Sequence, residues 1–446
     1  DVLGSRGLGD VYKRQPLLMK SYKMKSSDIN YAVKNNLCLG CGICADACPT
    51  KSIVMEIVKG EWRPVINPAQ CLNKKGCNKC YKVCSGVGME IKKYANDLYS
   101  SSETSDKYIG NYERLYTGYS SDMNIRKTAN SGGLLSSILI FLLQKRYIDG
   151  AIITRYSSEN PLQPSAFIAT TSEEILESKG SKYAPVQLSG TLRKALLLGK
   201  RYVIVGLPCH IQSVRKWAKI DSKVDKVIFA YFSLYCSSER CFYAQDYLCR
   251  YFNIEKCNIK EFSFREKGKL KFIGNNGENL LSMRRGDSPV FHKYYRLVGS
   301  HFKPNRCQMC VDHYGYLADM SFGDIGIAPY TQDKIGINSL IVRNPKFIEI
   351  LNEAIKDGCI ELKSLDPDLL NKSQGDMMFS RLKKAKAKCI LQSLIGKKSV
   401  EYDLLENESI TFHDLLKIIV VDIKRFIGRR KYLWFLIDFE NRNQKL

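Results

Sequence analysis

Two runs of cysteine near the amino terminus are the residues in this sequence best suited to chemistry. The first run has the spacing C-x2-C-x2-C-x3-C with a proline directly after it, and consists of Cys38, Cys41, Cys44 and Cys48. The second has the spacing C-x5-C-x2-C-x3-C, and consists of Cys71, Cys77, Cys80 and Cys84. Paired runs of this kind hold two [4Fe–4S] clusters in bacterial-type ferredoxins, where the fourth cysteine of each run ligates the other run's cluster. We therefore predict that Cys84 completes the first site and Cys48 the second.

A [4Fe–4S] cluster accepts one electron at a time, so the spacing predicts single-electron transfer. Zinc and disulfides are the alternatives. Structural zinc takes four ligands, often from two C-x2-C pairs, which does not account for eight cysteines in this pattern. A disulfide framework is typical of small secreted chains. The second run departs from the usual pattern in its five-residue first gap and in Ser85, which stands where proline is expected.

Length and composition indicate a large protein of a reducing compartment. With 446 residues, 44% of them hydrophobic, the chain is long enough for about two to four domains. Its 17 cysteines favour a cytoplasmic location, where thiols stay available for metal. The longest apolar run, residues 134–143, is too short for the roughly 20 residues of a membrane span, so no transmembrane span is predicted. Residues 1–30 are expected to be an unstructured tail or a remnant from outside the natural reading frame.

The formal net charge is +24, from 69 Lys and Arg against 45 Asp and Glu. Such a charge suits an acidic partner or an anionic cofactor. Abundant solvated lysine also explains it, and we favour this second interpretation. No helix-turn-helix, zinc-finger or RNA-recognition pattern accompanies the charge, so nucleic-acid binding is not predicted.

The elements expected from the sequence give an α/β fold, α+β overall. Residues 31–92 are predicted to form a dicluster ferredoxin module and residues 93–112 a linker rich in Ser and Asp. Beyond residue 116, apolar strands alternate with helical segments, which favours a body built on parallel strands. Residues 346–446 are expected to be a helical carboxyl-terminal region. Its last segment is basic and amphipathic; it suits a membrane surface, but we expect it to dock its apolar face on the body.

Four further cysteines stand at predicted strand ends or in loops: Cys209, Cys236, Cys307 and Cys310. Cysteines at the carboxyl ends of neighbouring parallel strands meet at one edge of a sheet, where α/β proteins place their ligands. Free cysteine is also among the most buried residue types, so structural burial remains the alternative from spacing alone.

Six motifs, taken in order, resemble the coenzyme F420 hydrogenase/dehydrogenase beta-subunit family; they lie at residues 130–137, 180–187, 205–216, 234–238, 262–267 and 306–324. The resemblance places that family's amino-terminal domain at residues 113–190 and its carboxyl-terminal domain at residues 191–345. The ferredoxin module is fused in front of them. The resemblance implies an iron–sulfur flavoprotein that binds FAD.

Carried over to this chain, the resemblance makes Cys209, Cys236, Cys307 and Cys310 ligands of a third [4Fe–4S] cluster. It also implies flavin contacts at Ser131, Gly132, Gly133, Lys182, Tyr183, Asp319 and Asp324, with turn geometry and surface capping as the alternative for the glycines and acids. The match is imperfect after the second strand, where Cys236 is followed by two serines; Cys241 is therefore a substitute ligand to consider.

Together these features predict an oxidoreductase that passes electrons between a small hydride donor or acceptor and a redox partner. The hydride donor or acceptor is coenzyme F420 or another small molecule, and the partner is an external carrier or a partner subunit. A flavin converts the two electrons of a hydride into single electrons for the clusters. The alternative is a non-catalytic electron-transfer subunit of a larger redox complex.

Overall fold

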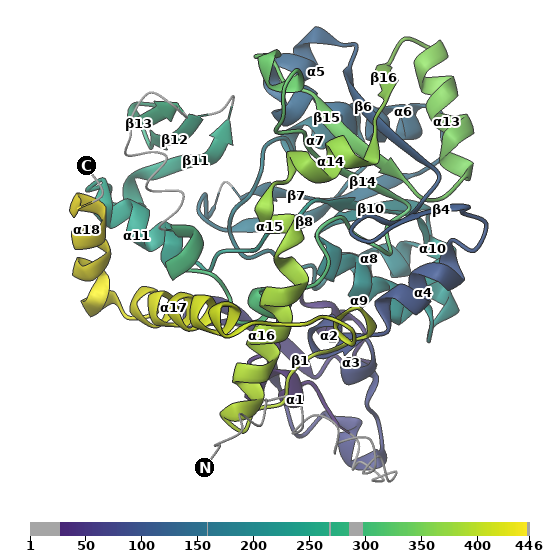
Figure 1. The fold of residues 1–446 in the computed structure, drawn as a ribbon. Helices are drawn as coiled ribbons and strands as arrows, with labels where there is room; N and C mark the ends of the chain where they lie inside the picture. Colours follow the sequence, from purple (N-terminus) through teal and green to yellow (C-terminus); the bar gives the residue numbers. More distant parts are fainter. Residues whose placement is uncertain (1–26, 158, 267–268, 285–297, 444–446) are drawn as a thin grey trace, which may run out of the picture.

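The computed structural model describes the whole chain except residues 1–26, 158, 267–268, 285–297 and 444–446. The predicted tail therefore lies outside the described residues, apart from 27–30. The described chain combines a ferredoxin-type module, a large α/β body, a small antiparallel sheet and a carboxyl-terminal helical arm (Figure 1). The predicted α/β class is confirmed.

The ferredoxin-type module consists of short helices that precede or carry the cysteine runs and one antiparallel hairpin. Its elements are α1 (Asn30–Lys34), α2 (Ile43–Asp46), β1 (Ile53–Val58), β2 (Glu61–Ile66), α3 (Lys79–Lys82) and β3 (Gly88–Met89). Gly40 and Gly42 have φ angles of +74° and +77°. At Gly42 a Cβ would lie 2.9 Å from Ser189 N, so the tight first loop requires glycine where it meets the body.

The predicted linker has structure of its own. It contains most of α4 (Ile91–Leu98) and a small hairpin of β4 (Thr104–Asp106) and β5 (Gly110–Tyr112). Asp106 Oδ1 accepts from two backbone N–H groups in the turn, those of Tyr108 (2.7 Å) and Ile109 (2.8 Å). Ser and Asp therefore form hydrogen bonds within this turn instead of marking a solvated linker.

An eight-stranded sheet forms the centre of the body, in the order β16-β6-β15-β14-β10-β9-β7-β8. The strands are β6 (Arg114–Ser120), β7 (Gly150–Tyr156), β8 (Pro164–Ala169), β9 (Tyr202–Gly206), β10 (Ile228–Leu234), β14 (Met320–Asp324), β15 (Asn338–Val342) and β16 (Ile360–Ser364). The four central strands, from β14 to β7, are parallel as predicted, whereas the strands on both flanks pair antiparallel. The sheet is therefore mixed.

Helices cover both faces of this sheet. Along β9 the side chains of Tyr202 and Ile204 belong to one core, and those of Val203 and Val205 to the other. A strand buried on both faces reads as a continuous apolar run, which is why β9 and β10 were recognisable in the sequence. The helices of the body are α5 (Met123–Thr128), α6 (Leu134–Gln144), α7 (Ser172–Glu177), α8 (Thr191–Leu198), α9 (Pro208–Ala218), α10 (Ser222–Val227) and α13 (Lys346–Lys356).

A smaller unit stands beside the body and has its own core. It contains α11 (Tyr243–Tyr251) and an antiparallel sheet of β11 (Ile259–Glu266), β12 (Lys269–Gly274) and β13 (Asn279–Arg284). The aromatic rings of Tyr247, Phe302 and Trp434 pack against one another at centroid distances of 5.5–5.8 Å. Trp434 comes from the end of the chain, so the carboxyl terminus completes this core.

The carboxyl-terminal region differs from the helical segment that was predicted. Its helices are α14 (Pro367–Ser373), α15 (Asp376–Phe379), α16 (Arg381–Leu394), α17 (Phe412–Gly428) and α18 (Trp434–Asn443), together with β16 and β17 (Glu401–Tyr402). Strand β16 forms one edge of the main sheet, and β17 pairs in parallel with β3 of the ferredoxin-type module. Pairing with distant strands, which local sequence does not encode, converts these two segments to strands.

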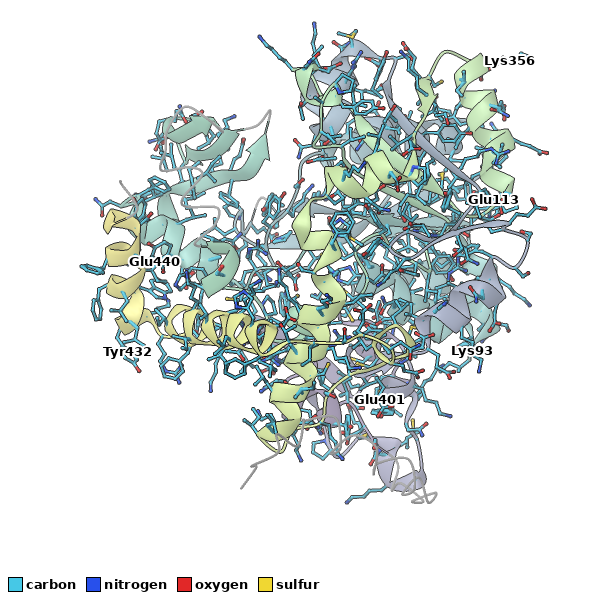
Figure 2. The ribbon with its side chains drawn as sticks, in the orientation of Figure 1. Lys93, Glu113, Lys356, Glu401, Tyr432 and Glu440 are labelled. Atoms are coloured by element: carbon cyan, nitrogen blue, oxygen red, sulfur yellow. The ribbon has the colours of Figure 1, made fainter. Side chains whose placement is uncertain are left out.

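The last predicted helix is two helices, and the expected docking of its apolar face is wrong for α17. Within α17 only Ile418 and Gly428 are buried. Its exposed large apolar residues continue into α18: Phe412, Leu416, Ile419, Val420, Ile423, Phe426, Tyr432, Phe435, Leu436 and Phe439. Figure 2 shows Tyr432 at the corner between the two helices. No helix among the described residues is long and apolar enough to cross a membrane.

Candidate metal centres and cofactor site

The first cysteine run and Cys84 lie together at the buried side of the ferredoxin-type module. Cys38, Cys44 and Cys84 are each at most 8% exposed. Burial raises the pKa of Cys38 to about 11 and that of Cys41 to about 12, and the neighbouring Cys84 thiol adds to both shifts. The fold thus brings the last cysteine of the second run beside the first run.

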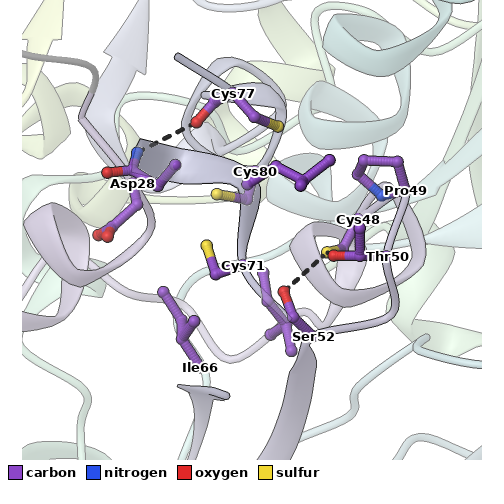
Figure 3. A pocket seen from close by; sticks show the side chains of 12 residues that line it. Asp28, Cys48, Pro49, Thr50, Ser52, Ile66, Cys71, Cys77 and Cys80 are labelled. Atoms are coloured by element: carbon purple, nitrogen blue, oxygen red, sulfur yellow. Dashed lines mark hydrogen bonds between the residues drawn. The ribbon is translucent and has the colours of Figure 1, made fainter. Parts of the chain in front are cut away.

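The second group lies in a pocket nearer the surface, which Figure 3 shows from close by. Cys48, Cys71, Cys77 and Cys80 all line this pocket, together with Asp28. Burial raises the pKa of Cys80 to about 11, and Cys48 contributes to the shift. The hydroxyls of Ser52 and Thr50 lie 3.2 Å and 3.6 Å from Cys48 Sγ, as hydrogen-bonding groups do around cluster sulfurs.

The third group forms where the body's parallel strands end. Cys209 follows β9 at the start of α9, and Cys236 follows the neighbouring strand β10. Burial and then the charges of Cys236, Cys310 and Cys307 raise the pKa of Cys209 well above its usual value. Cys241 instead lies fully buried in the core of the smaller unit, with Arg429 and Glu61 as its nearest charges. The structure therefore groups Cys236, and not Cys241, with the other three.

No three Cys, His, Asp or Glu side chains in the described part of the chain converge closely enough to hold a single metal ion. A four-iron cluster is ligated at separate iron corners, so its thiolates stand farther apart than the ligands of one ion. Three groups of four thiols suit a [4Fe–4S] cluster in number and type.

Cations surround the third group. Arg381 on α16 is 8% exposed and donates from Nη2 to the carbonyl oxygens of Cys236 (3.0 Å) and Asp312 (3.1 Å). Lys303 lies near Cys307, and burial lowers the pKa of Lys303 to about 8. A positive charge beside these thiols would stabilise the more negative, reduced form of a cluster held there and so raise its reduction potential. Neither Arg381 nor Lys303 was predicted from the sequence. Arg381 stands in a lysine-rich helix, far along the chain from these cysteines.

Ser85 joins the first and third groups directly. Its N–H donates to Ser213 Oγ (3.1 Å), and its hydroxyl donates to the Cys209 carbonyl (2.8 Å). Cys41 Sγ lies 3.8 Å from the same Ser213 Oγ. Arg306, which is 1% exposed, donates from Nε to Gly86 O (2.7 Å) and precedes Cys307. Ser85, where proline was expected, is therefore one of the contacts between module and body.

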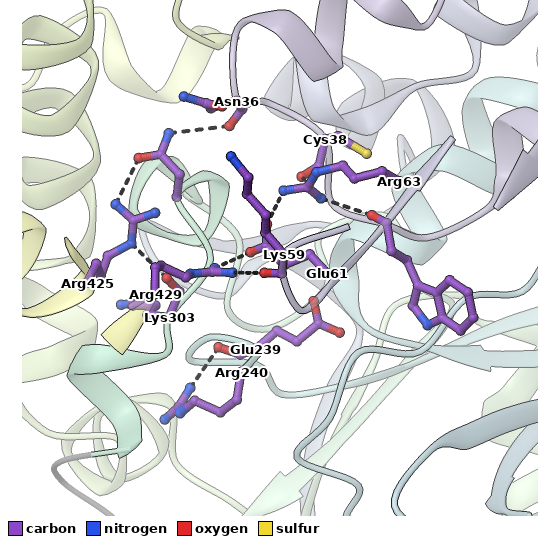
Figure 4. Close-up of polar contacts among 12 residues, drawn as sticks. Asn36, Cys38, Lys59, Glu61, Arg63, Glu239, Arg240, Lys303, Arg425 and Arg429 are labelled. Atoms are coloured by element: carbon purple, nitrogen blue, oxygen red, sulfur yellow. Dashed lines mark hydrogen bonds and ion pairs between the residues drawn. The ribbon is translucent and has the colours of Figure 1, made fainter. Parts of the chain in front are cut away.

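A second set of contacts fixes the module from the side of the helical arm, as Figure 4 shows. Glu61, on the hairpin, forms ion pairs with both Arg63 and Arg429, the latter just beyond α17. Arg63 also donates to the carbonyl oxygens of Trp62 (3.0 Å) and Cys38 (3.4 Å). Arg425 reaches Lys303 O at 2.7 Å. The arm therefore contacts residues that lie next to the first thiol group and residues that lie next to the third.

The predicted flavin turn lies at the same sheet edge as Cys236. Ser131 has a φ of +53° and its hydroxyl donates to Asp324, which ends β14. A Cβ at Gly132 would lie 2.5 Å from Gly336 O, and one at Gly133 would lie 2.8 Å from an Ile125 methyl carbon. Both glycines are thus explained by local packing. The Leu134 N–H donates to Asn338 Oδ1 (3.2 Å), so part of the amide set at the start of α6 is already satisfied.

Lys182 and Tyr183 lie next to this turn. Asn130 Nδ2 donates to Ser181 Oγ at 3.1 Å, which joins the two loops. Burial lowers the pKa of Lys182 to about 7, and its Nζ donates to the carbonyl oxygens of Ser178 and Lys179. Tyr183 packs against the core of the smaller unit. The Lys182 amine and the exposed carboxylate of Asp324, which accepts from Ser131, are the charged groups that these two loops offer to the polar part of a cofactor such as a flavin.

Asp319 does not join Asp324. It lies just before β14 and Asp324 ends it, so the two acids stand at opposite edges of the sheet. Asp319 is 3% exposed and forms an ion pair with Arg215 at 3.1 Å. Its Oδ2 also accepts from the Tyr231 N–H (2.8 Å). Asp319 anchors the amino edge of the sheet and is not a contact of the site at the carboxyl edge.

A ferredoxin-type module fused to an α/β body with a third cysteine quartet defines an iron–sulfur protein of oxidoreductase type. The family model "4Fe-4S dicluster domain" matches residues 37–93. The amino-terminal and carboxyl-terminal models of the coenzyme F420 hydrogenase/dehydrogenase beta subunit match residues 115–193 and 199–368. The chain belongs to the coenzyme F420 hydrogenase/dehydrogenase beta-subunit family. The resemblance noted in the sequence is confirmed.

Curated relatives carry names from the same chemistry. The coenzyme F420 hydrogenase subunit beta of Methanosarcina barkeri is 27% identical over 279 residues, 60% of this chain and 89% of that protein. A subunit of the F(420)H(2) dehydrogenase of Methanosarcina mazei is 27% identical over 322 residues, 70% of this chain and 80% of that protein. The coenzyme F420-dependent sulfite reductase of Methanocaldococcus jannaschii is 26% identical over 349 residues, 74% of this chain but 48% of that protein.

A solved structure shares the fold. It is the F420-reducing [NiFe] hydrogenase complex from Methanosarcina barkeri, of which one chain matches with a TM-score of 0.52 and 22% identity. The match covers 67% of this chain and 98% of that one. This likeness shows the shared fold. The class of oxidoreductase is supported by the family and by the names of the relatives, several of which are subunits of complexes.

Proposed function

We propose that this protein is an iron–sulfur flavoprotein oxidoreductase that transfers electrons between a small hydride carrier and a one-electron partner. The observation that carries the proposal is the continuous arrangement of three thiol quartets. The quartet of Cys209 contacts the quartet of Cys84 through Ser85. The quartet of Cys48 lies beyond it, in the pocket nearer the surface.

We infer the order of transfer from this arrangement. Each quartet would hold one [4Fe–4S] cluster, and the carboxyl edge of the sheet would hold FAD. When bound, the flavin supplies the conversion between hydride and single electrons. The chain's own residues do the rest: Ser131 and Asp324 shape the turn, Lys182 offers a buried amine, and Arg381 holds positive charge beside Cys236. The names of the relatives support coenzyme F420 as the first hydride carrier to test.

The test is anaerobic purification with flavin and iron quantification, followed by mixing with reduced F420. The expected result is one flavin per chain and bleaching of the cluster absorbance after mixing. Cys209→Ala should abolish the bleaching, whereas Cys257→Ala, at an exposed cysteine outside the quartets, should leave it unchanged. Protein that lacks flavin and does not take it up would contradict the flavoenzyme.

A non-catalytic electron-transfer subunit is the second candidate, favoured by the several relatives that are subunits of complexes. In that case the clusters would be reduced by a partner subunit or by dithionite, but never by a hydride carrier alone. Bleaching by reduced F420, or by another hydride donor, in the isolated chain would exclude this candidate.

A further inference from the structure

A second hollow opens at the amino edge of the sheet, opposite the thiol quartets. The parallel strands β9, β10 and β14 all begin there. The cavity has a volume of about 330 Å³ and is lined by Arg201, Arg215, Asp225, Lys226, Ile228, Phe229, Tyr231, Asp319, Asn344 and Lys346. Since the candidate cofactor site uses the carboxyl ends of the same strands, this hollow is separate from it.

The lining carries an excess of positive charge. Asp319 is neutralised within the protein, because it pairs with Arg215 and accepts from the Asn344 amide at 2.9 Å. Arg201 is partly compensated by Asp149 at 3.7 Å, a carboxylate outside the lining. Lys346 Nζ is held at the cavity by a bond to Phe229 O (2.7 Å). The remaining acid of the lining is Asp225, which opposes the positive charges of Arg201, Lys226 and Lys346.

Tyr231 gives the independent sign of a missing ligand. It is 2% exposed, and its hydroxyl has no hydrogen-bond partner in the described structure. The Arg215 guanidinium stacks over its ring at 3.6 Å from the centroid, which fixes the ring against the cavity. The hydroxyl oxygen is itself buried, and a buried hydroxyl without a partner costs about 1–3 kcal/mol, so a group bound in the cavity would gain a hydrogen bond once it reaches that atom.

The start of α13 adds to the positive charge at the cavity. This helix has 11 residues and begins at Lys346, and Asn344 just before it also lines the cavity. A helix amino terminus carries a partial positive charge and favours anions. Tyr231, Asn344, Lys346 and two arginines thus line one space.

We propose that this cavity binds a phosphate group, either free or as part of a small phosphorylated molecule. A phosphate offers several acceptor oxygens and a charge of about −1.5 to −2, which matches donors arranged around one point and two net positive charges. The volume leaves room for an organic part. The site is a binding site beyond the redox function and does not depend on it.

The experiment titrates the anaerobically purified full chain with inorganic phosphate at low salt, followed by calorimetry. Lys346→Gln should weaken binding roughly tenfold, about 1.4 kcal/mol. Tyr231→Phe, which removes only the hydroxyl, should weaken it by a similar factor. Asp225→Asn should tighten binding, because it removes the opposing charge. Lys356→Gln makes the same change at the other end of α13 and should have no effect.

The signs of these shifts make the test decisive. Lys346, Asp225 and Lys356 are exposed, so their variants are expected to fold, and a thermal midpoint checks each one. Acetate in place of phosphate should bind at least tenfold more weakly, and a phosphorylated sugar that binds more tightly than phosphate would identify the organic part as a contact. Absence of phosphate binding, or equal affinities in the Lys346, Tyr231 and Asp225 variants, overturns the proposal.

Discussion

At the scale of single residues, each cysteine run carries its thiols close together in the chain, whereas the guanidinium beside Cys236 comes from Arg381, 145 residues further on. The two cysteine runs could be assigned because their ligand geometry is set within a few residues. Arg381 could not, since its role depends on meeting Cys236, which lies far from it in sequence. Asp319 shows the same limit in reverse. The family resemblance grouped it with Asp324 at one site, but the length of β14 separates the two acids.

Ser85 provides the first prediction. Ser85→Pro keeps a backbone that proline tolerates, since Cys84 before it is extended (ψ 118°), but removes the N–H and hydroxyl that bond Ser213 and the Cys209 carbonyl. We expect a loss of about 1–3 kcal/mol in the free energy of unfolding. Ser85→Ala keeps the N–H and should lose less, as measured by urea midpoints. A proline variant as stable as the wild type would contradict this docking contact.

Lys182 provides a prediction in pH. Its pKa is about 7 in the folded protein and about 10.4 in an unfolded chain. Between these values the Lys182 amine binds one more proton in the unfolded chain than in the folded one, so the contribution of this group to stability should rise with pH from 7 to about 10. In the flavin-free protein, Lys182→Met should lower the slope of stability against pH by the equivalent of one bound proton, and Lys179→Met should not. Denaturant titrations at pH 7 and 9 measure it; an unchanged slope in Lys182→Met would show that the amine is not desolvated.

At the scale of elements, the sequence predicted segments whose pattern is decided locally. The apolar runs of β9 and β10 and the glycine-led start of α6 are of this kind. Strands β16 and β17 were missed because each exists only by pairing with a distant partner, β6 and β3. The periodicity of residues 413–439 predicted helix correctly but could not show which residues would be covered.

The carboxyl-terminal arm allows a test of which apolar residues in this segment are covered and which are exposed. Trp434 is 3% exposed and its ring packs between Tyr247 and Phe302, whereas the next residue, Phe435, is 60% exposed. Trp434→Ala should therefore destabilise the protein by about 3–5 kcal/mol. Phe435→Ala should change stability by no more than about 0.5 kcal/mol. Chemical unfolding of the two variants measures the difference; similar losses would mean that the outer face is covered in solution.

At the scale of the whole molecule, the fold brings together motifs that are separate in the sequence. The module was predicted as a ferredoxin fused in front of the body and joined to it by a linker. Instead, its loop at Ser85 lies against α9, its strand β3 pairs with β17, and its hairpin is bound by Arg429. Contacts from three directions hold one thiol quartet against another. Fixed spacing between redox centres follows from this packing and not from the ligand motifs themselves.

The proposed order of the quartets gives the last prediction. The wild type should contain about twelve irons per chain, and Cys77→Ala and Cys209→Ala should each lose about four. Their electron transfer should differ, because Cys209 belongs to the quartet on the body and Cys77 to the one farthest from it. Cys77→Ala should still show rapid reduction of its remaining clusters by the hydride donor, but slow transfer to an external acceptor. Cys209→Ala should show neither, although dithionite still reduces its two remaining clusters. Electron paramagnetic resonance after rapid freezing separates these outcomes, with Cys257→Ala as the control. Wild-type cluster reduction in Cys209→Ala would place the entry of electrons elsewhere and remove the quartet on the body from the path.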